Sequence, residues 1–182
     1  SSLVAAHDVM PDKGYLKYAE EFFSLIEKKY IQNKIYHSYS KEIVFIEDYA
    51  FLISALNDLS DKTMNFNYKN LARELCIEAI KKFYLNDKNI FQKNSKNSND
   101  VFFKPIDISD NTVPNGNAIM LINFTKLGMI VEAQKLSESL NGYLNVYKSH
   151  MMSSLRAIDY FRNIKEGKNC NEKGCNLDAK KN

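Results

Sequence analysis

The sequence predicts an all-α protein, an array of α/α-hairpins that forms part of an (α/α)6 toroid. In most segments apolar residues recur at spacings of three and four, which is the period of an α-helix. Segments that are apolar around most of their circumference also alternate with segments that are apolar on one side, as inner and outer helices do. Short links make consecutive helices antiparallel neighbours, so this alternation predicts a curved double layer.

The first half of the chain alternates from its beginning. Residues 3–10 are largely apolar, and we expect them to form an inner helix. Residues 15–31 carry one apolar stripe and predict an outer helix that begins after Gly14. Residues 46–59 are apolar on most sides and predict an inner helix, and residues 68–84 return to the one-sided pattern of an outer helix.

The middle of the chain interrupts the helices. Residues 86–113 have no continuous helical period. Within them, residues 89–92 and 101–104 flank a polar tip at residues 94–100, and the two flanks are expected to pair. The pattern therefore predicts a short β-hairpin insertion near residues 88–104.

Three further helices are predicted after this insertion. Residues 117–127 are apolar nearly all round and predict an inner helix, which is expected to end at Gly128. Residues 130–144 are one-sided and predict an outer helix. Residues 149–164 supply the last inner helix.

Length and composition limit the class of protein. We expect one domain over residues 1–165, followed by a polar, disordered tail over residues 166–182. No apolar run approaches the roughly 18 residues needed to cross a bilayer, so no membrane partner is expected. The three cysteines form no disulfide framework and suit a reducing compartment, which predicts a cytoplasmic protein.

Charge and motifs argue against several partners and cofactors. The net charge of +3 comes almost wholly from Lys, with Arg only at Arg73, Arg156 and Arg162. Recognition of phosphates and bases favours Arg, so no nucleic-acid partner is expected. The three histidines are dispersed, and the spacing of Cys170 and Cys175 is neither that of a zinc site nor that of a thioredoxin redox motif. In the absence of a phosphate-binding loop or a dinucleotide fingerprint, we expect no metal and no cofactor.

Two stretches carry a family resemblance. They are FIEDYAFL at residues 45–52 and KPIDISDNTVPNGN at residues 104–117. Over residues 15–161 the chain resembles the family of thioredoxin-domain proteins related to spermatogenesis-associated thioredoxin-like protein. The resemblance implies the later part of a helical toroid similar to N-acylglucosamine 2-epimerase. The chain departs from the family at Asn115, where Ser is usual, and it has no thioredoxin-like cysteines, so no redox function is implied.

The resemblance also implies a central pocket lined by the beginnings of the inner helices. The candidate catalytic residues are Glu47, Asp48 and His150, and the candidate substrate-binding residues are His37, Tyr49, Asp107, Asp110, Asn115 and Asn117. His150 is expected to begin the last inner helix and to act as an acid or base near neutral pH.

Each candidate has a structural alternative. Acidic residues at the beginning of a helix are favoured by its dipole, which would explain Glu47 and Asp48. Asp107, Asp110 and Asn115 would serve to shape the turn before the next helix. The histidines would simply be exposed or hydrogen-bonded.

Two functions follow from these expectations. The first is binding or isomerisation of a carbohydrate or another small polar ligand, with proton transfer beside a sugar carbonyl. The second is a non-catalytic helical interaction domain that supports an attached thioredoxin-like domain. Half a ring exposes inner helices at its ends, so we expect the remainder of the toroid or a second copy of the chain to be a partner.

Overall fold

The computed structural model of the chain describes residues 1–28, 35–37, 43–96, 105–167, 170–171 and 174–175. Within these residues the protein is mostly helical, with short antiparallel strand pairs, which confirms the all-α prediction with a small hairpin. The helices are α1 (Ser2–Val9), α2 (Tyr15–Ile26), α3 (Ile46–Thr63), α4 (Phe66–Phe83), α5 (Gly116–Lys126), α6 (Ile130–Tyr147) and α7 (Met152–Lys165), with 3-10 turns η1 (Pro11–Lys13) and η3 (Lys148–His150).

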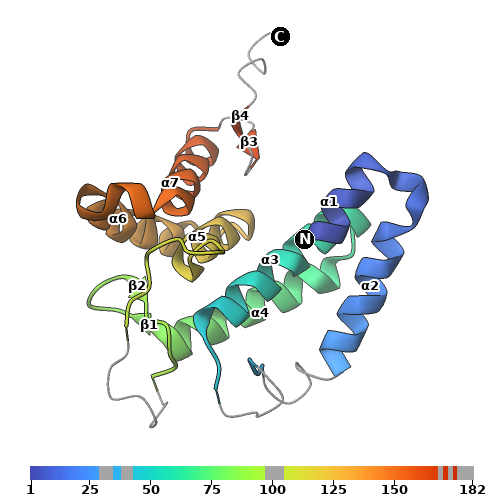
Figure 1. Cartoon of the computed structure of the whole chain (residues 1–182), viewed down its shortest axis with the longest axis horizontal. Coiled ribbons are helices and arrows are strands. Elements are labelled where there is room, and N and C mark those ends of the chain that lie inside the picture. The colour runs from blue at the N-terminus through green and yellow to red at the C-terminus, as the bar shows by residue number, and fades with distance from the viewer. Residues whose placement is uncertain (29–34, 38–42, 97–104, 168–169, 172–173, 176–182) are drawn as a thin grey trace.

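The helices are arranged as consecutive pairs in two rows (Figure 1). Helix α1 packs against α2, α3 packs against α4, and α5 packs against α6. Helix α5 also packs against α3 and α7, and α1 touches α3, so α1, α3, α5 and α7 form the inner row. The predicted alternation of inner and outer helices is therefore present from α3 to α7, whereas α1 buries only Val4 and is not the buried inner helix expected for residues 3–10.

Burial follows the same division. Helix α4 buries a single stripe, formed by Ala72, Leu75, Cys76, Ala79 and Phe83. Helix α5 buries almost its entire circumference, including the polar residues Asn117, Asn123 and Thr125. A helix surrounded by three others must bury polar side chains together with their partners, because an unpaired buried polar group is costly.

Helices α3 and α5 run in the same direction, because their first residues lie together and their later residues are joined by hydrogen bonds. Asn123 of α5 donates to the carbonyl of Ala50 at 2.8 Å and accepts from Asn57 at 3.3 Å. At the other end of α5, a Cβ atom on Gly116 would lie 3.0 Å from Ile46 Cγ2. The absence of a side chain at Gly116 therefore brings the N-terminal ends of α3 and α5 together.

Helix α5 ends as the sequence predicts. Gly128 adopts a left-handed conformation with φ 68°, and its N–H donates to the carbonyl of Thr125. The N–H of Met129 donates to the carbonyl of Phe124, which completes a Schellman motif. Arg73 of α4 donates to the carbonyl of Leu127, so the outer helix also secures this end.

A short β-hairpin is present, but it lies at residues 84–91, earlier in the chain than the hairpin predicted near residues 88–104. Strand β1 (Tyr84–Leu85) follows α4 directly and pairs with β2 (Ile90–Phe91). The other predicted strand, residues 101–104, lies outside the described residues. A closer partner costs less loop entropy, and Asn89, with φ 51°, makes the tight return to β2.

The end of the chain contains one further strand pair. Strand β3 (Cys170–Asn171) pairs with β4 (Gly174–Cys175) within the segment that the sequence predicts to be disordered. The other residues after 167 lie outside the described residues. Among the described helices, none combines the length and apolar content required to cross a membrane.

Candidate functional site

A hollow of about 370 Å³ lies at the N-terminal ends of α3 and α5. Its polar lining includes His37 from the link before α3, Glu47 from the first turn of α3, and Lys93 from the segment after β2. Asp107 and Asn115 come from the segment before α5. Four of the nine candidate site residues thus line one hollow, namely His37, Glu47, Asp107 and Asn115.

Backbone hydrogen bonds hold these segments together. The N–H of Ile46 donates to the carbonyl of Lys93 at 3.0 Å, and the N–H of Lys93 donates to the carbonyl of Pro105 at 2.8 Å. Phe45 and Asn94 form an isolated antiparallel bridge. The beginning of α3 is therefore joined to two segments that are distant in sequence.

Glu47 is the least satisfied polar side chain of the hollow. Its Oε2 atom is buried and has no hydrogen-bond partner among the described residues. Burial raises the pKa of Glu47, and the charges of Asp107 and Asp48 act in the same direction, although its own backbone N–H and Lys93 oppose them. A carboxyl group in this environment binds a proton more readily than an exposed one, and it can accept a hydrogen bond from a ligand.

One ion pair and one histidine–carboxylate contact lie beside Glu47. Lys93 Nζ lies 3.2 Å from Asp107 Oδ2, and His37 Nδ1 lies 2.9 Å from Asp48 Oδ1. Phe45 lies between the pairs: the His37 ring meets its edge at a centroid distance of 4.9 Å, and Lys93 Nζ lies 5.9 Å from its centroid. Donors, acceptors and an aromatic ring thus converge at one place.

Asp48 has a structural role in addition to its contact with His37. Its Oδ2 accepts from the N–H of Phe45 at 2.8 Å, which caps the beginning of α3. The structural alternative for Asp48, capping of the helix, is therefore observed together with the His37 contact. One carboxylate both begins the helix and orients the imidazole.

Asp110 and Asn115 tie the beginnings of α5 and α7 together. Asp110 Oδ1 accepts from the N–H and the side-chain amide of Asn115, at 3.1 and 2.9 Å, and Oδ2 accepts from the N–H of Ser153 at 2.7 Å. Asn115 caps α5 by accepting from the N–H of Ala118 and donates to Ser154 Oγ. The turn-making alternative is thus observed for both residues, although Asn115 also lines the hollow.

Asn117 and Tyr49 lie in the protein core. Asn117 is fully buried; it accepts from the N–H of Phe91 and donates to the carbonyls of Phe91 and Asp107. Tyr49 is also fully buried, and its hydroxyl donates to Glu78 and accepts from Lys82. Burial, followed by the contact with Glu78, raises the pKa of Tyr49 well above its ordinary value.

His150 is separate from this hollow. It ends the turn η3, whereas α7 begins at Met152, so His150 does not begin the inner helix as expected. Its side chain is exposed and is not part of the lining, and its carbonyl accepts from the N–H of Asp110 at 2.6 Å. The neighbouring Met151 is fully buried. Because that apolar side chain turns toward the core, His150 faces solvent.

The sequence does not indicate Lys93 or Phe45 as site residues. Lys93 reaches the hollow only because β2 and the segment after it fold back beside α3, which no local pattern reveals. Phe45 offers a weak signal, since an aromatic residue directly precedes two acidic residues at the beginning of an inner helix. Val113 and Pro114 add apolar surface to the lining.

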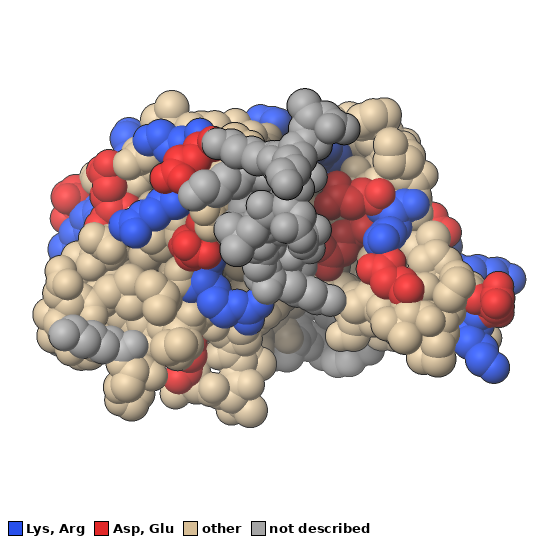
Figure 2. Space-filling model, turned by 90° about the horizontal axis from the view of Figure 1, so that it is seen from above, with Lys and Arg blue, Asp and Glu red and all other residues tan. Residues whose placement is uncertain are grey.

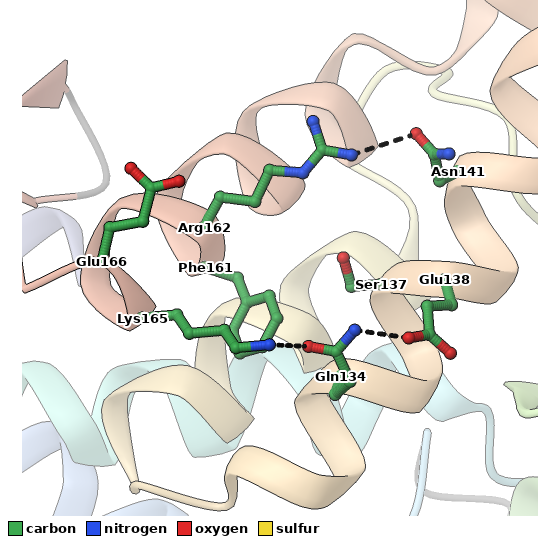
Figure 3. Close-up of a pocket in the computed structure, with 8 residues that line it drawn as sticks. All are labelled: Gln134, Ser137, Glu138, Asn141, Phe161, Arg162, Lys165 and Glu166. Carbon is green, nitrogen blue, oxygen red and sulfur yellow. Dashed lines mark hydrogen bonds between the residues drawn. The ribbon is translucent and has the colours of Figure 1, made fainter.

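A second hollow of about 460 Å³ lies between α6 and α7 (Figure 3). Here the polar side chains form hydrogen bonds with one another. Lys165 donates to Gln134, which in turn donates to Glu138, and Arg162 donates to Asn141. None of the candidate site residues lines it. We therefore place the candidate site at the smaller hollow, where a buried carboxylate oxygen has no partner in the described part of the chain.

One face of the molecule shows mixed charge. On the face drawn in Figure 2, Lys and Arg side chains are interspersed with Asp and Glu, and the described residues form no continuous basic stripe there. The described part of the chain also contains no group of three or more His, Cys, Asp and Glu side chains arranged to hold a metal ion.

Comparison with known proteins yields no relative: no family model matches the sequence, and no curated protein matches it. The function is therefore inferred from the geometry of the hollow.

The raised pKa of Glu47 predicts a dependence of stability on pH. A carboxyl group whose pKa is higher in the folded state favours folding below its unfolded value, near 4.5, and this contribution is lost as the pH rises through the folded value. We expect Glu47→Gln to raise the free energy of unfolding by about 0.5–1 kcal/mol at pH 7, because the unpartnered charge is removed.

Urea denaturation at pH 7 and pH 4 checks this expectation, and the gain should shrink at the lower pH. The exposed Glu74→Gln is the matched control and should change little at either pH. A Glu47→Gln variant that is less stable than the wild type at pH 7 would show that the ionised carboxylate is favourably solvated.

Proposed function

We propose that the hollow at the beginnings of α3 and α5 binds a small polyhydroxylated ligand, such as a monosaccharide. The observation that supports this most strongly is the buried Oε2 atom of Glu47, which has no partner among the described residues. It lies beside the Lys93–Asp107 ion pair, the His37–Asp48 contact and an aromatic ring. A volume of about 370 Å³ is within the usual range of small-molecule sites.

The chemistry of the lining suits a sugar. Each sugar hydroxyl both donates and accepts, and the hollow offers acceptors on Glu47 and Asp107 and donors on Lys93 and His37. The apolar surfaces of Phe45, Val113 and Pro114 match the C–H faces of a sugar ring.

If the ligand is isomerised, His37 and Glu47 would transfer the proton, and His150 would not. Asp48 engages Nδ1 of His37, which leaves Nε2 as the ring nitrogen available to a ligand. Burial raises the pKa of Glu47, so this carboxyl holds a proton more readily than an ordinary glutamate. Two titratable groups in different environments are the arrangement that acid–base catalysis requires.

A thermal-shift screen against monosaccharides tests the binding proposal. A ligand at about ten times its Kd stabilises the folded state by about 1.4 kcal/mol, which raises the Tm of a domain of this size by about 3–6 °C. We expect Glu47→Ala to abolish that shift. The control Glu138→Ala alters the hollow between α6 and α7 and should preserve it. A shift lost only in the Glu138 variant, or no shift with any sugar, would contradict the proposal.

A non-catalytic interaction domain is the second candidate, favoured by apolar side chains on α2. Tyr18, Phe22 and Leu25 are each more than half exposed, at 57%, 61% and 56%. Large exposed apolar side chains on one helix are typical of a surface that meets another protein. The remainder of a toroid or a second copy of the chain would cover them, and analytical ultracentrifugation over a range of concentrations distinguishes self-association from a monomer.

A further inference from the structure

The charge of the candidate hollow limits the kind of ligand it takes. Its acidic groups are Glu47 and Asp107, with Asp48 directly behind His37. Its cation is Lys93, which already pairs with Asp107 at 3.2 Å. After this pairing, the hollow keeps the negative charge of Glu47, and it would repel a ligand carboxylate or phosphate.

Lys93 and His37, two of the donors that line the hollow, each already contact a carboxylate. Lys93 Nζ is held by Asp107, and His37 Nδ1 is held by Asp48 at 2.9 Å. Oε2 of Glu47 is buried and has no hydrogen-bond partner among the described residues. Glu47 lines the hollow, so the negative charge of its carboxylate acts on any ligand bound there.

We propose that the ligand presents a protonated amine to Glu47, as an amino sugar or a related amino polyol does. This inference rests on the proposed binding function. A ligand ammonium supplies both the missing donor and the missing positive charge, whereas a hydroxyl supplies only the donor. A hydrogen bond to the ionised carboxylate is strengthened with either donor, and an ammonium adds a charge–charge attraction that a hydroxyl lacks.

Phe45 fits the same ligand. Its ring already lies beside two cationic or titratable groups, Lys93 and His37. The electron-rich face of an aromatic ring attracts cations, so Phe45 favours positive charge in this part of the hollow. The Phe45 ring and the Glu47 carboxylate thus both favour a positively charged ligand.

A matched set of sugars tests the proposal by isothermal titration calorimetry at pH 6.5. Glucose, glucosamine, N-acetylglucosamine and glucuronate share one ring, and each of the last three differs from glucose at one position: an ammonium at C2, an acetamide at C2 or a carboxylate at C6. We expect glucosamine to bind about tenfold more tightly than glucose, which corresponds to about 1.4 kcal/mol. N-acetylglucosamine should resemble glucose, and glucuronate should bind most weakly.

The variant Glu47→Gln identifies the counter-ion. It should reduce the preference for glucosamine over glucose to less than threefold, while its thermal unfolding confirms that the variant is folded. If glucose binds as tightly as glucosamine, or if Glu47→Gln keeps the preference, the inference is overturned while the binding function stands. If none of the four sugars binds, both the inference and the binding function are overturned.

Discussion

Replacing Asn117 by alanine is expected to lower the free energy of unfolding by about 3–5 kcal/mol. The Asn117 side chain is fully buried and exchanges hydrogen bonds with the N–H and the carbonyl of Phe91, at 2.9 and 3.0 Å. It also donates to the carbonyl of Asp107 at 3.1 Å. The variant would leave one N–H and two carbonyls without these partners, and it would leave a small cavity. Few single substitutions of a polar residue should cost as much.

Urea denaturation followed by circular dichroism measures this effect. Asn65→Ala is the matched control, because Asn65 is an exposed residue that caps α4 by accepting from the N–H of Asn67. Loss of that cap should cost only about 1 kcal/mol. If the two alanine variants are equally stable, Asn117 does not hold the hairpin against α5 in the way described.

Asp110→Asn is the second substitution with a large expected effect, a loss of about 2–4 kcal/mol. Both carboxylate oxygens of Asp110 accept backbone N–H groups, from Asn115 on one side and Ser153 on the other. An amide has a single oxygen, so in either orientation its NH2 group would face a donor. The beginnings of α5 and α7 would lose their common anchor.

Two measurements separate this effect from a general loss of stability. Hydrogen exchange should increase at Ser153 and Ser154, in the first turn of α7, before it increases elsewhere. The exposed Asp12→Asn on η1 serves as the control and should stay within about 0.5 kcal/mol of the wild type. Unchanged protection at Ser153 would contradict the anchoring role of Asp110.

The alternation of inner and outer helices was predictable because burial is periodic along the chain. Leu75, Ala79 and Phe83 belong to the apolar side that the sequence shows, and they are buried in the structure. Gly128 was predictable for a similar reason, since a left-handed residue after a helix is most often Gly. These features depend on neighbours along the chain, which the sequence displays directly.

The composition of the hollow was only partly predictable, because it depends on contacts between distant segments. Asn117 was expected to need hydrogen-bond partners, but the sequence does not show that the backbone of Phe91 supplies them. His150 is adjacent to Met151, and consecutive residues point in different directions, so burial of one turns the other outward. Lys93 lies at the hollow because its backbone carbonyl accepts from the N–H of Ile46 and its N–H donates to the carbonyl of Pro105.

The most direct test of the proposed site is a titration of the ¹⁵N-labelled chain with a monosaccharide, followed by NMR chemical-shift mapping. The account predicts that perturbed amides cluster at His37, Phe45, Glu47, Lys93 and Asp107, the residues that line the hollow at the beginnings of α3 and α5. Perturbations confined to Gln134, Asn141 and Arg162, in the groove between α6 and α7, would contradict it, as would a spectrum that no sugar changes.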